Sequence, residues 1–189
     1  MNILQKYSIW LRRCRHCRGF GIQSPTDYAF VRYVINEHWP YYAYCDLKVE
    51  LPAVTSDCRK LAELYFRIAN WLQPSKTVVV SEYEAVYSRY VHTGCSKTNF
   101  VSPEILFHDD DKHVLIILGR CADRLLALKC CELCTERSLI VVEDIYGTNK
   151  SLWNEMAGSD SVRISYDLYY AGIAMFDKAR YKTNYKINF

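Results

Sequence analysis

The sequence lacks the features that define several special classes of protein. No apolar run approaches the roughly 20 residues that a membrane-spanning helix needs, so we expect no membrane span. The first 23 residues carry four arginines and no continuous apolar stretch, so we expect no secretory signal peptide. Repeats, low-complexity tracts and the G-x-S-x-G motif of serine hydrolases are absent as well. The formal net charge of +3 is too small to indicate a class of partner.

Cysteine and tyrosine, by contrast, are abundant. The 189 residues include nine cysteines and sixteen tyrosines, and the overall balance of 50% hydrophobic and 24% charged residues is typical of one soluble globular domain. Without a signal peptide, we interpret the cysteines as free thiols in a reducing compartment and expect a cytoplasmic protein. The many tyrosines also argue against disorder.

The middle of the chain alternates between helical and strand-like patterns. Residues 58–72 place apolar side chains on one helical face, and Pro74 follows directly after them. Residues 122–134 repeat the helical spacing. Three short apolar runs are typical of strands buried on both faces, and they lie at residues 77–80, 113–119 and 139–143. The order of these segments predicts a strand–helix–strand unit of a parallel sheet.

The two ends of the chain predict different elements. Residues 2–13 have helical spacing, and Ser24 followed by Pro25 is typical of a second helix start. Residues 39–56 contain two prolines, and we expect a loop or short turns there. Near the other end, residues 162–176 alternate apolar and polar side chains around a short break, which predicts a terminal β-hairpin.

Loops at the carboxyl ends of parallel strands are the first place to look for a site, because α/β sheets bind ligands there. The loop after the first run contains no glycine, so it does not fit a backbone cradle for phosphate; its candidate residues are Ser81, Glu82, Tyr83 and Ala85. The end of the second run offers a single glycine, Gly119.

Two adjacent carboxylates, Glu143 and Asp144, follow the third run. Such a pair can bind a cation or accept a proton from a substrate. The alternative is that one of them caps a helix or pairs with a basic side chain. We favour this alternative because no second acidic cluster supplies the further oxygen ligands that a cation requires.

Two C-x-x-C pairs, Cys14 with Cys17 and Cys131 with Cys134, together offer the ligands of a four-thiolate zinc site. The pairs lie far apart in the chain, however. Cys134 also continues an apolar helical stripe with Cys130, where cysteine behaves as a small hydrophobic residue. A thioredoxin-like redox role is disfavoured because neither pair directly follows a predicted strand. We therefore expect no metal.

Four arginines fall within the seven residues from Arg12 to Arg18. Such a segment can contact nucleic acid or an acidic partner. The alternative is a solvated surface and favourable positive charge at a helix C-terminus. We favour the alternative because no companion basic stripe occurs elsewhere in the chain.

Several segments, taken together, are similar to those of one bacterial protein family. They are RHCRGFGIQSP at residues 15–25, PYYAY at 40–44, the helix and strand at 60–80, IVVEDIY at 140–146, and residues 166–176 with INF at 187–189. In these segments the chain resembles bacterial class I S-adenosylmethionine-dependent methyltransferases with a helical N-terminal extension. The resemblance implies a three-layer Rossmann-like α/β sheet, mostly parallel, with a C-terminal antiparallel hairpin. We expect the helical extension at residues 1–56 and the methyltransferase-like domain at residues 57–189.

The residues that hold S-adenosylmethionine in that family are replaced here. The family's first strand ends in a pattern like E-x-G-T-S-x-G; this chain has Val79 for the acid, Ser81 and Ala85 for the glycines, and Glu82 and Tyr83 for the hydroxyl residues. No acid for the ribose hydroxyls is evident near residues 100–103, and the aspartate and histidine expected beside Gly119 are missing. The interval from residue 81 to residue 113 is also short for two helix–strand units, so we expect a sheet reduced in the middle.

Three hypotheses for function remain. The first is a methyltransferase-like but non-catalytic binding or assembly module without a cofactor, which acts as a homodimer or with a protein partner. The second is a divergent active methyltransferase, in which S-adenosylmethionine supplies the methyl group and Glu143 or Asp144 acts near the substrate. The third is a nucleic-acid-binding protein that uses the basic segment at residues 12–18.

Overall fold

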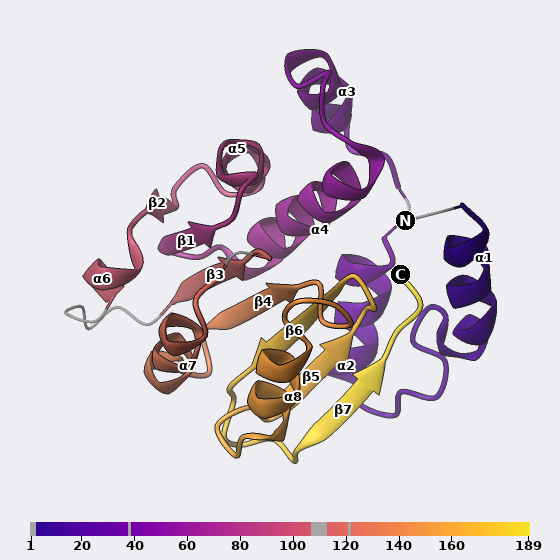
Figure 1. The fold of residues 1–189 in the computed structure, drawn as a ribbon, viewed down its shortest axis with the longest axis vertical. Helices are drawn as coiled ribbons and strands as arrows, with labels where there is room; N and C mark the ends of the chain where they lie inside the picture. The colour runs from indigo at the N-terminus through magenta and orange to yellow at the C-terminus, as the bar shows by residue number, and fades with distance from the viewer. Residues whose placement is uncertain (1–2, 38, 107–112, 121) are drawn as a thin grey trace.

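The computed structural model describes residues 3–37, 39–106, 113–120 and 122–189, and these residues contain a seven-stranded sheet (Figure 1). The strand order is β2-β1-β3-β4-β6-β5-β7. Strands β1 to β4 are parallel, β6 is antiparallel to both β4 and β5, and β7 is parallel to β5. The strands are β1 (Lys76–Val80), β2 (Asn99–Phe100), β3 (Val114–Leu118), β4 (Leu139–Glu143), β5 (Ile164–Asp167), β6 (Ala171–Met175) and β7 (Thr183–Lys186).

Helices cover both faces of this sheet. One face packs against α2, the π-helical segment that follows it, α4 and α5, and the other face packs against α6, α7 and α8. The helices are α1 (Ile3–Arg12), α2 (Pro25–Phe30), α3 (Tyr42–Glu50), α4 (Ser56–Leu72), α5 (Glu84–Gly94), α6 (Pro103–Leu106), α7 (Arg124–Leu133) and α8 (Lys150–Gly158), with η1 at Cys14–His16 and η2 at Val31–Ile35. The chain therefore has the three-layer Rossmann-like α/β fold that the sequence predicts.

The central strands show why continuous apolar runs indicate this architecture. Side chains of a strand alternate between the two faces of its sheet, so a strand covered on both faces needs an apolar residue at every position. In β3, Leu115 and Ile117 enter the core beneath α4, whereas Ile116 and Leu118 enter the core beneath α7. All five residues of β3 are buried, as are all five of β4.

The predicted strands and the hairpin are confirmed. The three apolar runs form adjacent parallel strands: Thr77 is opposite Leu115, and Leu115 is opposite Leu139. The terminal hairpin consists of β5 and β6, with β6 inserted beside β4. The sequence did not indicate β7, a four-residue strand with alternate half-buried and exposed positions at the edge of the sheet. Between β1 and β3 the described residues include a strand of only two residues, β2, and a helix of only four, α6.

The expected loop at residues 39–56 is wrong, because Tyr42–Glu50 forms the helix α3. Its two prolines, Pro40 and Pro52, lie outside the helix at either end, where they do not disturb its hydrogen bonds. Only Tyr44 and Leu47 of this helix are buried, so α3 has too few core-facing residues to show a helical period. In Figure 1 α3 stands away from the sheet, beyond the end of α4. No helix among the described residues is long and apolar enough to cross a membrane.

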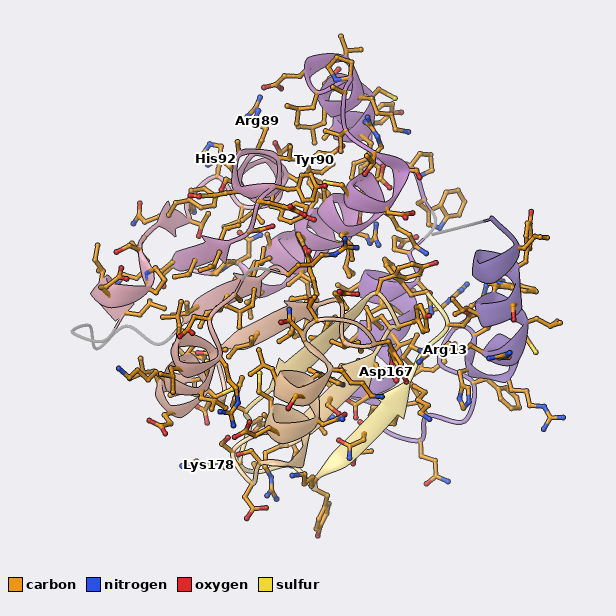
Figure 2. All side chains as sticks on the ribbon, viewed as in Figure 1. Arg13, Arg89, Tyr90, His92, Asp167 and Lys178 are labelled. Carbon is orange, nitrogen blue, oxygen red and sulfur yellow. The ribbon has the colours of Figure 1, made fainter. Side chains whose placement is uncertain are left out.

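Arg13 joins the N-terminal helix α1 to the far end of the chain. It is only 8% exposed, and its guanidinium donates to the carbonyl oxygens of Asp167 at 2.9 Å and of Ile187 at 3.2 Å. It also donates to the Asp167 carboxylate at 2.8 Å and to the Tyr146 hydroxyl at 3.1 Å. Figure 2 shows Arg13 and Asp167 facing each other between α1 and the sheet. This arginine therefore has a structural role rather than a free, solvated one.

Asp27 joins α2 to the sheet in a similar way. The Ser24 side chain accepts a hydrogen bond from the Asp27 backbone N–H, so the predicted helix start at Ser24 and Pro25 is confirmed. The Asp27 carboxylate accepts from the hydroxyls of Tyr166 at 2.6 Å and Tyr185 at 3.0 Å, and pairs with Arg180. Burial alone raises the pKa of Asp27, but the hydrogen bonds from Tyr166 and Arg180 outweigh it and hold the pKa below its usual value.

We predict that Arg13→Ala lowers the free energy of unfolding by about 2–4 kcal/mol, because it leaves the largely buried Asp167 carboxylate without its positive partner. Urea unfolding measures the loss. Arg12→Ala is the matched control: Arg12 is exposed on the same turn, and we expect a change below about 0.5 kcal/mol. Equal stabilities of the two variants would contradict the structural role of Arg13.

Candidate functional site

A cavity of about 410 Å³ lies at the carboxyl ends of the central strands, where α/β sheets bind ligands. Its lining comes from the first turns of α4 and α5, from the ends of β3 and β4, and from the turn between β5 and β6. We call it the tyrosine cavity because five tyrosines line it together with three acids and one arginine: Tyr83, Tyr87, Tyr146, Tyr169 and Tyr170, Asp57, Glu143 and Asp144, and Arg120.

Glu143, the last residue of β4, is the buried acid of this cavity. It is 5% exposed, and its Oε1 accepts a hydrogen bond from the Tyr65 hydroxyl at 2.7 Å. The Tyr87 hydroxyl bonds to the same carboxyl group. Burial raises the pKa of Glu143 above its ordinary value, and the two tyrosine hydrogen bonds only partly oppose this. No lysine, arginine or histidine in the described part of the chain forms an ion pair with it.

The groups around Glu143 are neutral hydrogen-bond donors. Burial raises the pKa of Tyr65 and Tyr87, and the nearby Glu143 charge raises both further, so their hydroxyls remain protonated at neutral pH. Cys58, in the first turn of α4, is buried beside them, and burial raises the pKa of its thiol. A protonated thiol is a poor nucleophile, so the geometry does not favour covalent catalysis by Cys58.

Asp144 has a different environment from Glu143. Its backbone is in the left-handed region with φ of 54°, and its carboxylate accepts from both the N–H and the hydroxyl of Thr148 at 3.0 Å. Arg120 lies 3.9 Å away. Asp144 thus closes the turn that precedes α8 and pairs loosely with a basic side chain, which is the structural alternative for one of the two acids. Glu143 is the acid that the structure places in the floor of the cavity.

The loop after β1 closes the crevice between β1 and β3. The strand order reverses here, since the chain runs from β1 outward to β2 and then returns to β3 on the other side. Ser81 packs directly on Gly119: a Cβ added to Gly119 would lie 2.7 Å from the Ser81 Oγ. The Gly119 N–H also donates to the Val80 carbonyl at 2.7 Å. Ser81 and Gly119 thus pack on each other where the ends of β1 and β3 meet.

The sequence candidates therefore occupy different places. Tyr83 lines the tyrosine cavity, Ser81 and Gly119 pack on each other, and Glu82 and Ala85 are exposed. Sequence reasoning missed the cavity residues Cys58, Tyr87, Tyr146, Tyr169 and Tyr170, and also Tyr65, whose hydroxyl donates to Glu143. The only signal for the tyrosines was their high number, because these residues come from several separate segments of the chain and no local motif joins the segments.

The cysteine pairs do not form a metal site in the described residues, which contain no group of three or more histidine, cysteine, aspartate or glutamate residues that could hold an ion. Cys130 and Cys131 are buried in α7, and burial raises their pKa to about 11 and about 12. Cys14 and Cys17 lie at and just after η1. Cys121, which follows Arg120, lies outside the described residues.

The basic segment at residues 12–18 is divided by the fold. Arg13 is buried by its contacts with Asp167 and Ile187, whereas Arg12, Arg15 and Arg18 are exposed. The exposed arginines therefore account for all the positive charge that this segment offers to a partner.

Comparisons with known proteins add little to this geometry. No protein-family model matches the chain, and no curated protein matches it. Among solved structures, the crystal structure of cofactor-bound Rv0187 from MTB is similar over 82% of this chain and 99% of that chain, with 10% sequence identity and a TM-score of 0.48.

We predict that Glu143→Gln gains stability relative to the wild type as the pH rises from about 5 to 8. Because folding raises the pKa of Glu143, the folded wild type binds a proton that the unfolded chain releases, and its stability falls as the pH rises from the unfolded to the folded pKa. The amide does not titrate. Each unit of pKa elevation contributes about 1.4 kcal/mol to the difference.

Urea unfolding at several pH values in this range measures the difference between the two proteins. Glu132→Gln, which changes an exposed glutamate in α7, is the control and should run parallel to the wild type. A pH-independent difference between Glu143→Gln and the wild type would show that folding does not raise this pKa.

Proposed function

We propose that this chain is a methyltransferase-like Rossmann domain that binds a small ligand in the tyrosine cavity but neither holds S-adenosylmethionine nor transfers a methyl group. The observation that carries the proposal is the direct contact of Ser81 with Gly119 at the reversal point of the sheet. A cofactor that approaches the backbone there needs glycine at the position of Ser81. The ligand-sized space lies instead beside β4, under the tyrosines.

Charge supports the same conclusion. Glu82 and Glu84, both exposed in and beside the loop after β1, would repel the carboxylate of S-adenosylmethionine. The three residues directly after the short strand β2 are Val101, Ser102 and Pro103, so the strand end itself carries no acid for the ribose hydroxyls. Each lost hydrogen bond of this kind weakens binding by about 1–3 kcal/mol.

One observation favours the divergent, active enzyme as the second candidate. Glu143 is a buried carboxyl group with a raised pKa at the floor of a cavity, and a general base with a pKa nearer neutrality is better matched to proton transfer. In this alternative Glu143 would accept a proton from the substrate nucleophile. It requires S-adenosylmethionine to bind, so cofactor binding separates the two candidates.

We predict that calorimetric titration with S-adenosylmethionine and with S-adenosylhomocysteine detects no binding tighter than about 100 μM, which corresponds to about 5.5 kcal/mol of binding free energy. Ser81→Gly, which removes the side chain that fills the crevice, should bind either compound more tightly than the wild type does. Binding tighter than about 100 μM by the wild type would reject the proposal and favour the active enzyme. Equal, weak binding by both proteins would show that Ser81 is not the obstacle.

A further inference from the structure

We propose that the tyrosine cavity binds a small organic cation of the methylated-ammonium class, with the Glu143 carboxylate as its counter-charge. This inference rests on the proposed function, because it names the ligand class of the same cavity. Three independent features of the described residues support it. In this part of the chain Glu143 has no ion pair, the rings of Tyr83 and Tyr87 contact no cation, and acids outnumber basic residues in the cavity lining.

Among the described residues, Glu143 lacks the ion pair that comparable carboxylates in this protein have: Arg120 is near enough to lower its pKa but pairs with Asp144. Asp27 and Asp167 also accept hydrogen bonds from tyrosine hydroxyls, and each is in addition paired with an arginine, Arg180 and Arg13 respectively. Glu143 has the tyrosine hydroxyls but no ion pair with any described residue. A buried carboxylate without a counter-charge is unfavourable, so a cation that enters the cavity would compensate it.

Aromatic side chains form the wall above Glu143. Tyr83 and Tyr87 have ring centroids 5.9 Å apart, and neither ring contacts a cation of the described chain. The opposite wall shows that rings in this region do bind cations: Arg13 lies 5.4 Å from the Tyr169 centroid, and Lys60 lies 4.8 Å from that of Tyr170. The positive end of a methylated ammonium is attracted to aromatic faces in the same way.

Both of these protein cations lie outside the tyrosine cavity. Arg13 and Lys60 line a neighbouring cavity of about 400 Å³, which shares Tyr169 and Tyr170 with the tyrosine cavity. They do not line the tyrosine cavity itself.

The charge and size of the cavity fit such a ligand. Its lining holds the carboxyl groups of Glu143 and Asp144 beside the cation Arg120, whose side chain is largely exposed and directed to Asp144. An anionic ligand would meet this excess of acids, whereas a cation is attracted by it. A volume of about 410 Å³ accommodates a molecule of the size of choline.

Calorimetric titration of the full chain with choline tests the proposal, with 3,3-dimethylbutan-1-ol as the uncharged control of the same shape. We expect choline to bind with a dissociation constant below about 1 mM and at least about tenfold more tightly than the alcohol. Equal affinities would show a merely apolar cavity and overturn the proposal. Absence of choline binding at 10 mM would overturn it too, as would displacement of choline by inorganic phosphate.

Variants locate the binding site. Glu143→Gln should weaken choline at least about tenfold and leave the alcohol unchanged, because it removes the charge and keeps the shape. Tyr83→Ala removes a half-exposed ring of the wall without disturbing the buried floor, and should also weaken choline. Tyr42→Ala is the matched control, since Tyr42 is 95% exposed on α3. Unchanged choline affinity in both cavity variants would overturn the assignment even if one variant proved unstable.

Binding should also depend on pH, because the cation favours the ionised form of Glu143. The titratable and charged groups that face Glu143 are Tyr65 and Cys58 from α4, Tyr87 and Glu82 from the α5 side, and Arg120 after β3. Burial holds the three neutral groups in their protonated forms, so Glu143 is the group that titrates. Choline affinity should therefore rise from pH 5 to pH 8 in the wild type and remain constant in Glu143→Gln.

A parallel titration separates this inference from the proposed function. If neither choline nor S-adenosylmethionine binds, the ligand class is wrong while the non-catalytic domain stands. If S-adenosylmethionine, itself a cation, binds tightly and displaces choline, the proposed function fails and the cavity is a cofactor site.

Discussion

The hydrogen bond between a tyrosine hydroxyl and a buried carboxylate is the interaction on which this structure depends. It occurs at Asp27, where α2 meets the sheet, at Asp167, where α1 meets it, and at Glu143, at the end of β4. A tyrosine can place most of its ring in the core and still present a donor to an acid. Tyr65, Tyr146, Tyr166 and Tyr185 serve in this way among the sixteen tyrosines of the chain.

The three carboxylates differ in one respect. At Asp27 and Asp167 an arginine completes the arrangement, so each acid is a closed structural contact that ties distant parts of the chain together. At Glu143 tyrosine hydroxyls hydrogen-bond to the carboxyl group without an ion pair to any described residue, and the burial that raises its pKa is only partly offset by these hydrogen bonds and by the charge of Arg120. An incomplete arrangement at the floor of a cavity is the condition under which a ligand, rather than the protein, supplies the missing group.

The sequence predicts those parts of the fold in which a regular pattern of apolar residues marks the buried positions. The strands β3 and β4 are apolar at every position, and α4 has an apolar face over seventeen residues, so both could be recognised locally. By contrast, α3 buries only Tyr44 and Leu47, and β7 has four residues at the edge of the sheet. Neither pattern is long or regular enough to distinguish a helix or strand from a loop.

The candidate site could be predicted only in part, for a related reason. Glu143 was identifiable because the end of a buried strand is a recognisable position. Its partners were not, since Tyr65 lies in the middle of α4 and is indistinguishable there from a core residue. Nothing in the local sequence of Ser81 and Gly119 reveals that their atoms meet across two strand ends, although the missing glycines did indicate that the loop had changed.

The N-terminal helix lies next to the tyrosine cavity and contacts its wall through Arg13. Arg13 follows α1, and its guanidinium lies 5.5 Å from the centroid of Tyr146 and 5.4 Å from that of Tyr169, two rings that stack on each other and line the tyrosine cavity. It also holds Asp167, which accepts the Tyr146 hydroxyl. Any displacement of α1 that withdraws Arg13 would release both rings at once. The docking of α1 on the sheet thus contributes to the positions of two rings of the cavity wall.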